Sequence, residues 1–171
     1  MKAIKLLFTA LGLGIALQLS AQSDEEEYAA LVSGDVDKFL ETFQPMTEDF
    51  EVIKDKLNEN GELDETQAAY NETGDMSELR ALYNEPEVKA VFAKYGWDEQ
   101  YYGKMQTIVT GLGVVYLEKE MEKRADELTA EEKAMMQRMY DNQEKKVDDA
   151  SLSMIEAKAD ELMVLFEMNQ E

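Results

Sequence analysis

Beyond residue 27, apolar side chains recur at spacings of three and four residues, and turn-forming residues separate these repeats. Such a periodicity predicts helices, and no strand pattern is present. Residues 28–43 follow a helical period with a possible break at Ser33-Gly34-Asp35, and Pro45 is expected to end this element. Thr47 is then expected to cap a second helix. The apolar stripe of that second helix consists of Phe50, Ile53 and Leu57.

Residues 86–98 contain clear sequence signals for a corner between two helices. Pro86 lies in the first turn of a helix, where no backbone hydrogen bond is lost. Gly96 is expected to end this helix, because glycine readily adopts the left-handed conformation that closes many helices. Trp97 follows where a hydrophobic residue packs back onto the last turn, near Phe92, and Asp98 is expected to cap the next helix.

That next helix, about residues 99–127, is predicted to be the centre of the fold. No residue between Met105 and Leu117 is charged, and a helix without a polar face is a buried helix. Thirteen uncharged residues are too few for a membrane span, which needs about 20. One side of the helix carries residues that would allow another backbone to approach closely: Gly103, Thr107, Thr110, Gly111 and Val114.

The remaining elements complete an all-helical chain. A short helix is expected near 75–83, and Thr129 with Glu132 predicts a capping box for another. The last helix is expected to run from about 149 to 168 as one piece, with a stripe of Leu152, Ile155, Ala159, Leu162 and Phe166. The fold class is therefore all-α, a single-domain bundle of about five to seven helices around a central buried helix near 99–127.

The first residues predict export. Residues 1–21 resemble a secretory signal peptide, with Lys2 and Lys5 before an apolar run that is too short to cross a bilayer. The predicted domains are therefore this signal, an acidic flexible tail over 22–27 and an all-helical domain over 28–171. The expected location is outside the cytoplasm, periplasmic in a Gram-negative host and secreted otherwise.

The charge is strongly acidic, with a formal net value of −21. All 38 acidic and 15 of the 17 basic residues lie beyond residue 21, which gives −23 without the predicted signal. A field of this sign repels nucleic acids and anionic lipid surfaces and attracts cationic peptides or basic protein faces. The expected partners are therefore proteins or cationic peptides, with no nucleic acid and no stable membrane insertion after signal cleavage.

The chain contains neither histidine nor cysteine. Their absence excludes ordinary catalytic triads, cysteine nucleophiles and zinc sites of the His/Cys type. Carboxylate pairs are inevitable among 38 acidic residues, and none lies in the apolar part of the central helix, where burial would raise a pKa. We therefore expect no enzymatic activity and no catalytic residue.

Aromatic residues near the Gly96 corner form the candidate ligand-binding site. Side chains of this kind either line a pocket for a small apolar molecule or belong to the core beside a helix corner. The candidates are Tyr95, Trp97, Tyr101, Tyr102 and Tyr116.

Two segments raise the question of metal binding. Residues 56–67, KLNENGELDETQ, place Gly61 as a calcium loop would, but Lys56 and Gln67 replace the two strongest carboxylate ligands. A helix end followed by a polar turn explains this stretch better. The cluster of Met135, Met136 and Met139 would suit Cu(I), a pliable peptide-binding groove or core filling. No metal site or cofactor is predicted, and a Ca or Cu(I) binder stays an alternative.

The segment LTAEEKAMMQ, residues 128–137, resembles the Leu-Thr-x-x-Gln signature of small periplasmic stress chaperones of the Spy/CpxP type. Glu132 stands where that signature has glutamine, there is no second copy, and a capping box explains the same letters. The sequence therefore favours an exported, non-enzymatic helical protein that binds a protein or peptide or supports the cell envelope. A module binding a small apolar ligand near Trp97 is the alternative.

Overall fold

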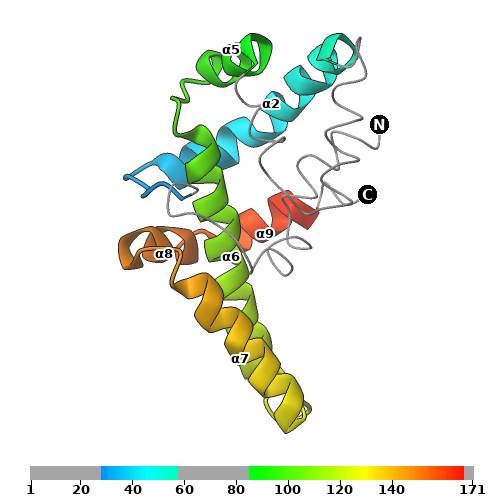
Figure 1. Ribbon diagram of the computed structural model, residues 1–171, viewed down its shortest axis with the longest axis vertical. Helices are drawn as coiled ribbons and strands as arrows, with labels where there is room; N and C mark the ends of the chain where they lie inside the picture. The colour runs from blue at the N-terminus through cyan, green and yellow to red at the C-terminus, as the bar shows by residue number, and fades with distance from the viewer. Residues whose placement is uncertain (1–27, 58–84, 168–171) are drawn as a thin grey trace.

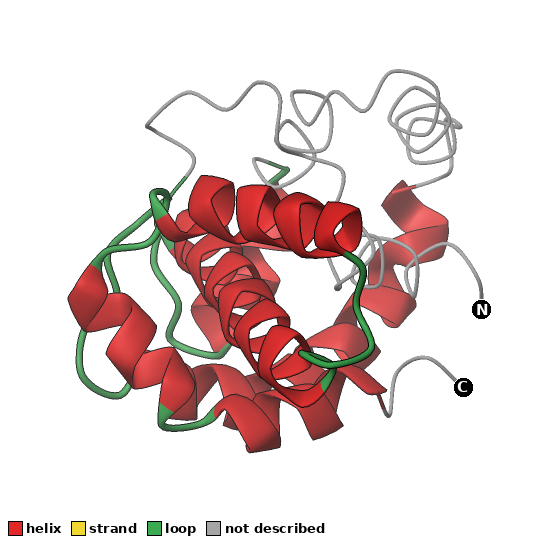
Figure 2. Ribbon diagram, turned by 90° about the horizontal axis from the view of Figure 1, so that it is seen from below, coloured by secondary structure: helices red, strands yellow, loops and turns green. Residues whose placement is uncertain are grey.

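The computed structural model describes residues 28–57 and 85–167, and every regular element in them is a helix (Figures 1 and 2). This confirms the all-α prediction. The predicted signal peptide, the acidic tail, most of the 56–67 stretch and the helix near 75–83 lie outside the described residues. The helices are α2 (Asp35–Leu57), α5 (Pro86–Lys94), α6 (Tyr101–Lys123), α7 (Ala130–Glu144), α8 (Asp149–Glu156) and α9 (Ala159–Glu167).

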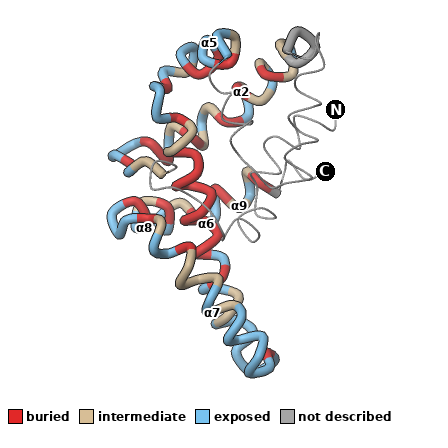
Figure 3. The backbone as a smooth tube through the Cα atoms, in the orientation of Figure 1, coloured by how far each residue is buried: buried red, intermediate tan, exposed pale blue. Residues whose placement is uncertain are grey.

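The long helix α6 runs through the middle of the molecule (Figure 1). Helices α2, α7, α8 and α9 all contact it. Every residue from Lys104 to Val115 is buried, and burial falls away toward the C-terminal end of the helix (Figure 3). The helix is shorter at both ends than the predicted range 99–127.

Pro45 does not end a helix, and the predicted break there is wrong. Helix α2 continues through it, and Thr47, the predicted cap, donates its hydroxyl hydrogen to the Phe43 carbonyl within the helix at 2.8 Å. A proline inside a helix costs about 3 kcal/mol. The buried stripe on both sides of the proline is continuous, and each large apolar side chain contributes about 1.5–3 kcal/mol when buried. This stripe consists of Phe39, Phe43, Met46 and Phe50.

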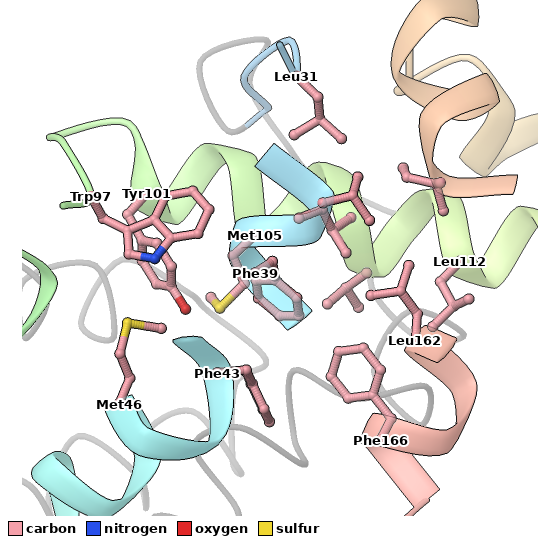
Figure 4. Packing of buried hydrophobic residues seen from close by; sticks show 14 of the residues in the cluster. Leu31, Phe39, Phe43, Met46, Trp97, Tyr101, Met105, Leu112, Leu162 and Phe166 are labelled. Carbon is pink, nitrogen blue, oxygen red and sulfur yellow. The ribbon is translucent and has the colours of Figure 1, made fainter. Parts of the chain in front are cut away.

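The core forms where α2 and α9 meet α6 (Figure 4). The ring of Phe166 in α9 lies 5.5 Å from that of Phe43 and 6.1 Å from that of Phe39, measured between centroids. Met105 and Leu112 of α6 belong to the same buried cluster. Helices far apart in the sequence are therefore joined by one set of aromatic contacts.

The predicted single helix over 149–168 is instead two helices, α8 and α9. The Lys158 amide donates to the Ile155 carbonyl at 3.0 Å, a tightened three-residue turn in place of the regular four-residue bond. This turn redirects the chain, so that α8 packs against α6 while Phe166 of α9 reaches the phenylalanines of α2. Neither glycine nor proline marks the turn, so the apolar spacing runs through it unchanged.

The predicted helix ends at Gly96 and Thr129 are confirmed. Gly96 has a φ of +74°, its amide donates to Ala93, and the Trp97 amide donates to Phe92, both at 3.0 Å. Thr129 forms the capping box with Glu132. The predicted cap Asp98 accepts the Gln100 amide hydrogen at 2.9 Å, but the helix begins later, at Tyr101.

Helix α8 packs tightly against α6 at Gly111. A methyl group added there would overlap Cδ1 of Ile155, which is fully buried, and would lie 3.6 Å from a methyl carbon of Val147. The small-residue side of α6 thus receives a neighbouring helix, as a glycine at a helix contact allows.

We expect the effect of Gly111→Ala on stability to change sign with the size of the side chain at position 155. In the native chain, overpacking of about 1–3 kcal/mol outweighs the roughly 1 kcal/mol that alanine gains over glycine in a helix. In an Ile155→Val background the overlapping methyl is gone, so Gly111→Ala should stabilise by about 1 kcal/mol. Urea unfolding of the four proteins measures this coupling. Purely additive effects would contradict the close contact.

Asp148 joins the start of the described chain to α8. Its carboxylate accepts the backbone and side-chain hydrogens of Ser151 at 2.9 and 2.6 Å, and the Ser151 hydroxyl oxygen accepts the Leu31 amide hydrogen at 2.9 Å. The hydrogen bonds from the Ser151 side chain and backbone hold the pKa of Asp148 below its ordinary value of 3.8.

Asp148→Ala should destabilise the protein in a pH-dependent way. A lost cap costs about 1 kcal/mol. A carboxylate with a lowered native pKa stabilises fully above its unfolded pKa, and this contribution is lost as pH falls through the native pKa. The deficit of Asp148→Ala, measured by urea unfolding, should therefore be constant above about pH 5 and shrink in acid. Asp149→Ala, which removes no such cap, is the matched control, and an equal deficit there would contradict the assignment.

Candidate functional site

The structure gathers four of the five candidate aromatic residues and leaves the fifth elsewhere. Tyr95, Trp97, Tyr101 and Tyr102 lie at or next to the corner between α5 and α6. Tyr116 lies 15 residues beyond Tyr101 on the same helix, which is about 22 Å along the axis. One site cannot include all five.

Trp97 and Tyr101 are core residues. Their ring centroids lie 4.9 Å apart, and the Tyr101 ring lies 4.2 Å from that of Phe92. Figure 4 shows both side chains directed toward α2. The Trp97 indole donates to the Thr42 hydroxyl at 2.9 Å, and the Lys38 ammonium lies 4.4 Å from the Trp97 ring centroid. These contacts fix the corner onto α2, and a small-molecule pocket beside them stays a prediction.

Polar contacts to Asp49 of α2 also hold this corner in place. Asp49 of α2 accepts hydrogen bonds from Lys94 at 2.5 Å and from the Tyr95 hydroxyl at 2.7 Å. These two bonds lower the pKa of Asp49, and the bond to Asp49 raises the pKa of Tyr95. A tyrosine that acts as a base or nucleophile needs a lowered pKa, so this arrangement serves to hold α5 against α2.

The Tyr101 hydroxyl differs from that of Tyr95. The Tyr101 side chain is 1% exposed, burial raises its pKa, and its hydroxyl has no hydrogen-bond partner among the described residues. A buried polar group without a partner costs about 1–3 kcal/mol.

Removing each hydroxyl should therefore have opposite effects. Tyr101→Phe should stabilise the protein by about 1 kcal/mol, because the unsatisfied group is deleted while the ring stays. Tyr95→Phe should destabilise it, because the bond to Asp49 is lost. Thermal unfolding of both variants under identical conditions is the measurement. A loss of stability in Tyr101→Phe would mean that its hydroxyl is satisfied in solution.

The second candidate is the surface that carries the methionine cluster, for which the sequence left a peptide-binding groove as one of three interpretations. The C-terminal part of α6, the turn after it and α7 form a helical hairpin, residues 116–144, which we call the hairpin arm. It projects beyond the rest of the helices, and most of its surface is exposed (Figures 1 and 3). Within α7 only Gln143 is buried, in contrast to the twelve consecutive buried residues of α6.

Few side chains hold the two helices of the hairpin arm together. Among the apolar and aromatic side chains of the arm, Leu117 and Leu128 are buried and four are half-buried: Met121, Met136, Met139 and Tyr140. The capping box at Thr129 starts α7 directly after the turn. The segment that resembles the chaperone signature is therefore the tip of this arm, where Thr129 and Glu132 serve the helix end.

One side of the hairpin arm is strongly acidic. The pKa of Tyr140 is raised by burial and then by the negative charges of Glu144, Glu118 and Glu156, which come from three different helices. The Tyr140 hydroxyl lies 3.4 Å from a Glu144 oxygen. Across residues 28–57 and 85–167, no group of three or more acidic side chains is arranged to hold a metal ion.

The other side of the hairpin arm exposes apolar side chains. Met135 is 56% exposed and Tyr116 is 39% exposed. For these methionines the sequence left three interpretations open, Cu(I) binding, a pliable peptide-binding groove and core filling, and it favoured the core. The available signal was the sudden run of charge after Leu117, which marks where the central helix leaves the other helices.

No family model matches this chain, and searches of curated proteins and of solved structures find no similar protein either. None of the helices in the described part combines the length and apolarity needed to span a bilayer. The site must therefore be judged on its own geometry.

Proposed function

We propose that this chain is an exported, non-enzymatic protein that binds another protein or peptide on its hairpin arm, either as a free partner or as part of the cell envelope. One observation carries this proposal. The hairpin arm projects beyond the core and presents methionine and tyrosine side chains among carboxylates, although α7 has almost no role in the core. Flexible thioethers at the surface suit adaptable binding of polypeptides.

Other features agree with a role without catalysis. The chain has no histidine or cysteine, and the pKa values of Tyr95 and Tyr101 are raised, the direction opposite to that of an activated group. The extracytoplasmic location rests on the signal-like residues 1–21. A small-molecule site near Trp97 is less favoured, because Trp97 and Tyr101 are packed into the core.

Site-specific photocrosslinking tests this function. The full chain carries a benzophenone side chain in place of Met135, Gln137 or Val52, and each protein is irradiated with a peptide library of mixed charge. We expect peptide adducts at one or both α7 positions and few at Val52, which is 80% exposed on α2 and serves as the matched control. Absence of adducts on α7, or equal labelling at Val52, would refute the proposed function.

A further inference from the structure

The hairpin arm has two faces, which can be told apart by helix geometry. On α6, Tyr116 and Glu118 point about 160° apart, on opposite sides of buried Leu117. On α7, Tyr140 lies on one side of buried Gln143, while Met139 and Met135 lie on the other. Tyr140 is close to Glu118, so these two residues share one face.

The opposite face must then contain Tyr116, Met139 and Met135, and we call it the open face. Met135 and Tyr116 are its exposed members, and Met139 is half-buried. Charged residues flank these apolar groups one helical turn away. Glu131, four residues before Met135, is exposed, whereas Glu120, four residues after Tyr116, is half-buried and lies 3.7 Å from the Lys123 ammonium. Lys119 and Arg138 follow Tyr116 and Met135 by three residues each, so the charge next to the apolar groups is mixed, and the carboxylates are in excess only over the arm as a whole.

The negative charge of the hairpin arm favours some partners of the open face over others. The hairpin arm contains nine Asp and Glu against five Lys and Arg, and the whole chain has a net charge of −21. A second copy of this chain, with the same acidic arm and the same net charge, would be repelled. An apolar segment that carries positive charges on its flanks matches both the apolar side chains and the carboxylates.

We propose that the open face docks a cationic amphipathic polypeptide segment, with its apolar side chains on Tyr116, Met135 and Met139 and its basic side chains beside exposed carboxylates such as Glu131. This inference rests on the proposed function and names the partner of the same surface. The acidic face around Tyr140 lacks exposed apolar side chains of this kind, so it attracts positive charge without providing an apolar contact.

Fluorescence anisotropy with labelled synthetic peptides and the full chain tests this inference. Three helical peptides of equal length are compared: one of Leu and Lys, one of Leu and Glu, and one of Ser and Lys. Only the Leu/Lys peptide should bind tightly, and its Kd should rise with salt. The double variant Tyr116→Ser, Met135→Ser should weaken binding at least about tenfold. Val52→Ser and Gln137→Ser, outside the open face, should leave the Kd unchanged.

The other outcomes separate this inference from the proposed function. Equal binding of the Ser/Lys peptide would show that charge alone acts, and equal binding of the Leu/Glu peptide would remove the role of charge, so either result overturns the inference. Self-association through the open face, seen in sedimentation as a dimer lost in the double variant, would also overturn it. If library peptides crosslink to α7 while the Leu/Lys peptide does not bind, the inference fails and the proposed function stands.

Discussion

The structure depends on the burial of Met105–Val115, which is most of the uncharged stretch of α6. A helix with no polar face must be covered on all sides, and α2, α7, α8 and α9 provide that cover. Charge marks both limits of this stretch. At its beginning, the buried ammonium of Lys104 lies 3.4 Å from the Asp35 carboxylate, and the same oxygen of Asp35 accepts the Val32 amide hydrogen at 2.9 Å. At its end, Glu118 is exposed, and there the core stops.

The hairpin arm follows from this limit. Because α6 continues as one helix beyond Leu117, its last turns leave the core without a break in backbone hydrogen bonding. Its direction is therefore set by the buried part of the same helix, and α7 packs along it. A surface built on a continuous helix is more precisely placed than one on a loop, which is what a binding site on rigid elements requires.

Features set by neighbouring residues could be predicted from the sequence, whereas features decided by packing between distant segments could not. The left-handed Gly96 and the Thr129–Glu132 capping box are set by residues within one turn of each other, so their positions could be predicted. Pro45 failed as a helix end because a phenylalanine and methionine stripe outweighs its cost, which only packing reveals. The turn after α8 has no local signal. For the candidate aromatic residues the sequence left two possibilities open, a ligand pocket or the core beside a helix corner, and spacing alone could not show that Trp97 is buried while Met135 is exposed.

The strongest argument for function is that no side chain of α7 belongs to the buried hydrophobic cluster, although the helix packs along α6. A residue in the core is chosen for its volume, so its identity says little about binding. Met135 contributes nothing to the buried cluster, and a charged residue at the same position would serve solubility better in a chain already rich in carboxylates. Packing of the core therefore does not account for an exposed thioether on the same arm as exposed Tyr116. The proposed contact with a partner would account for it, since an apolar group at the surface gains free energy when something covers it.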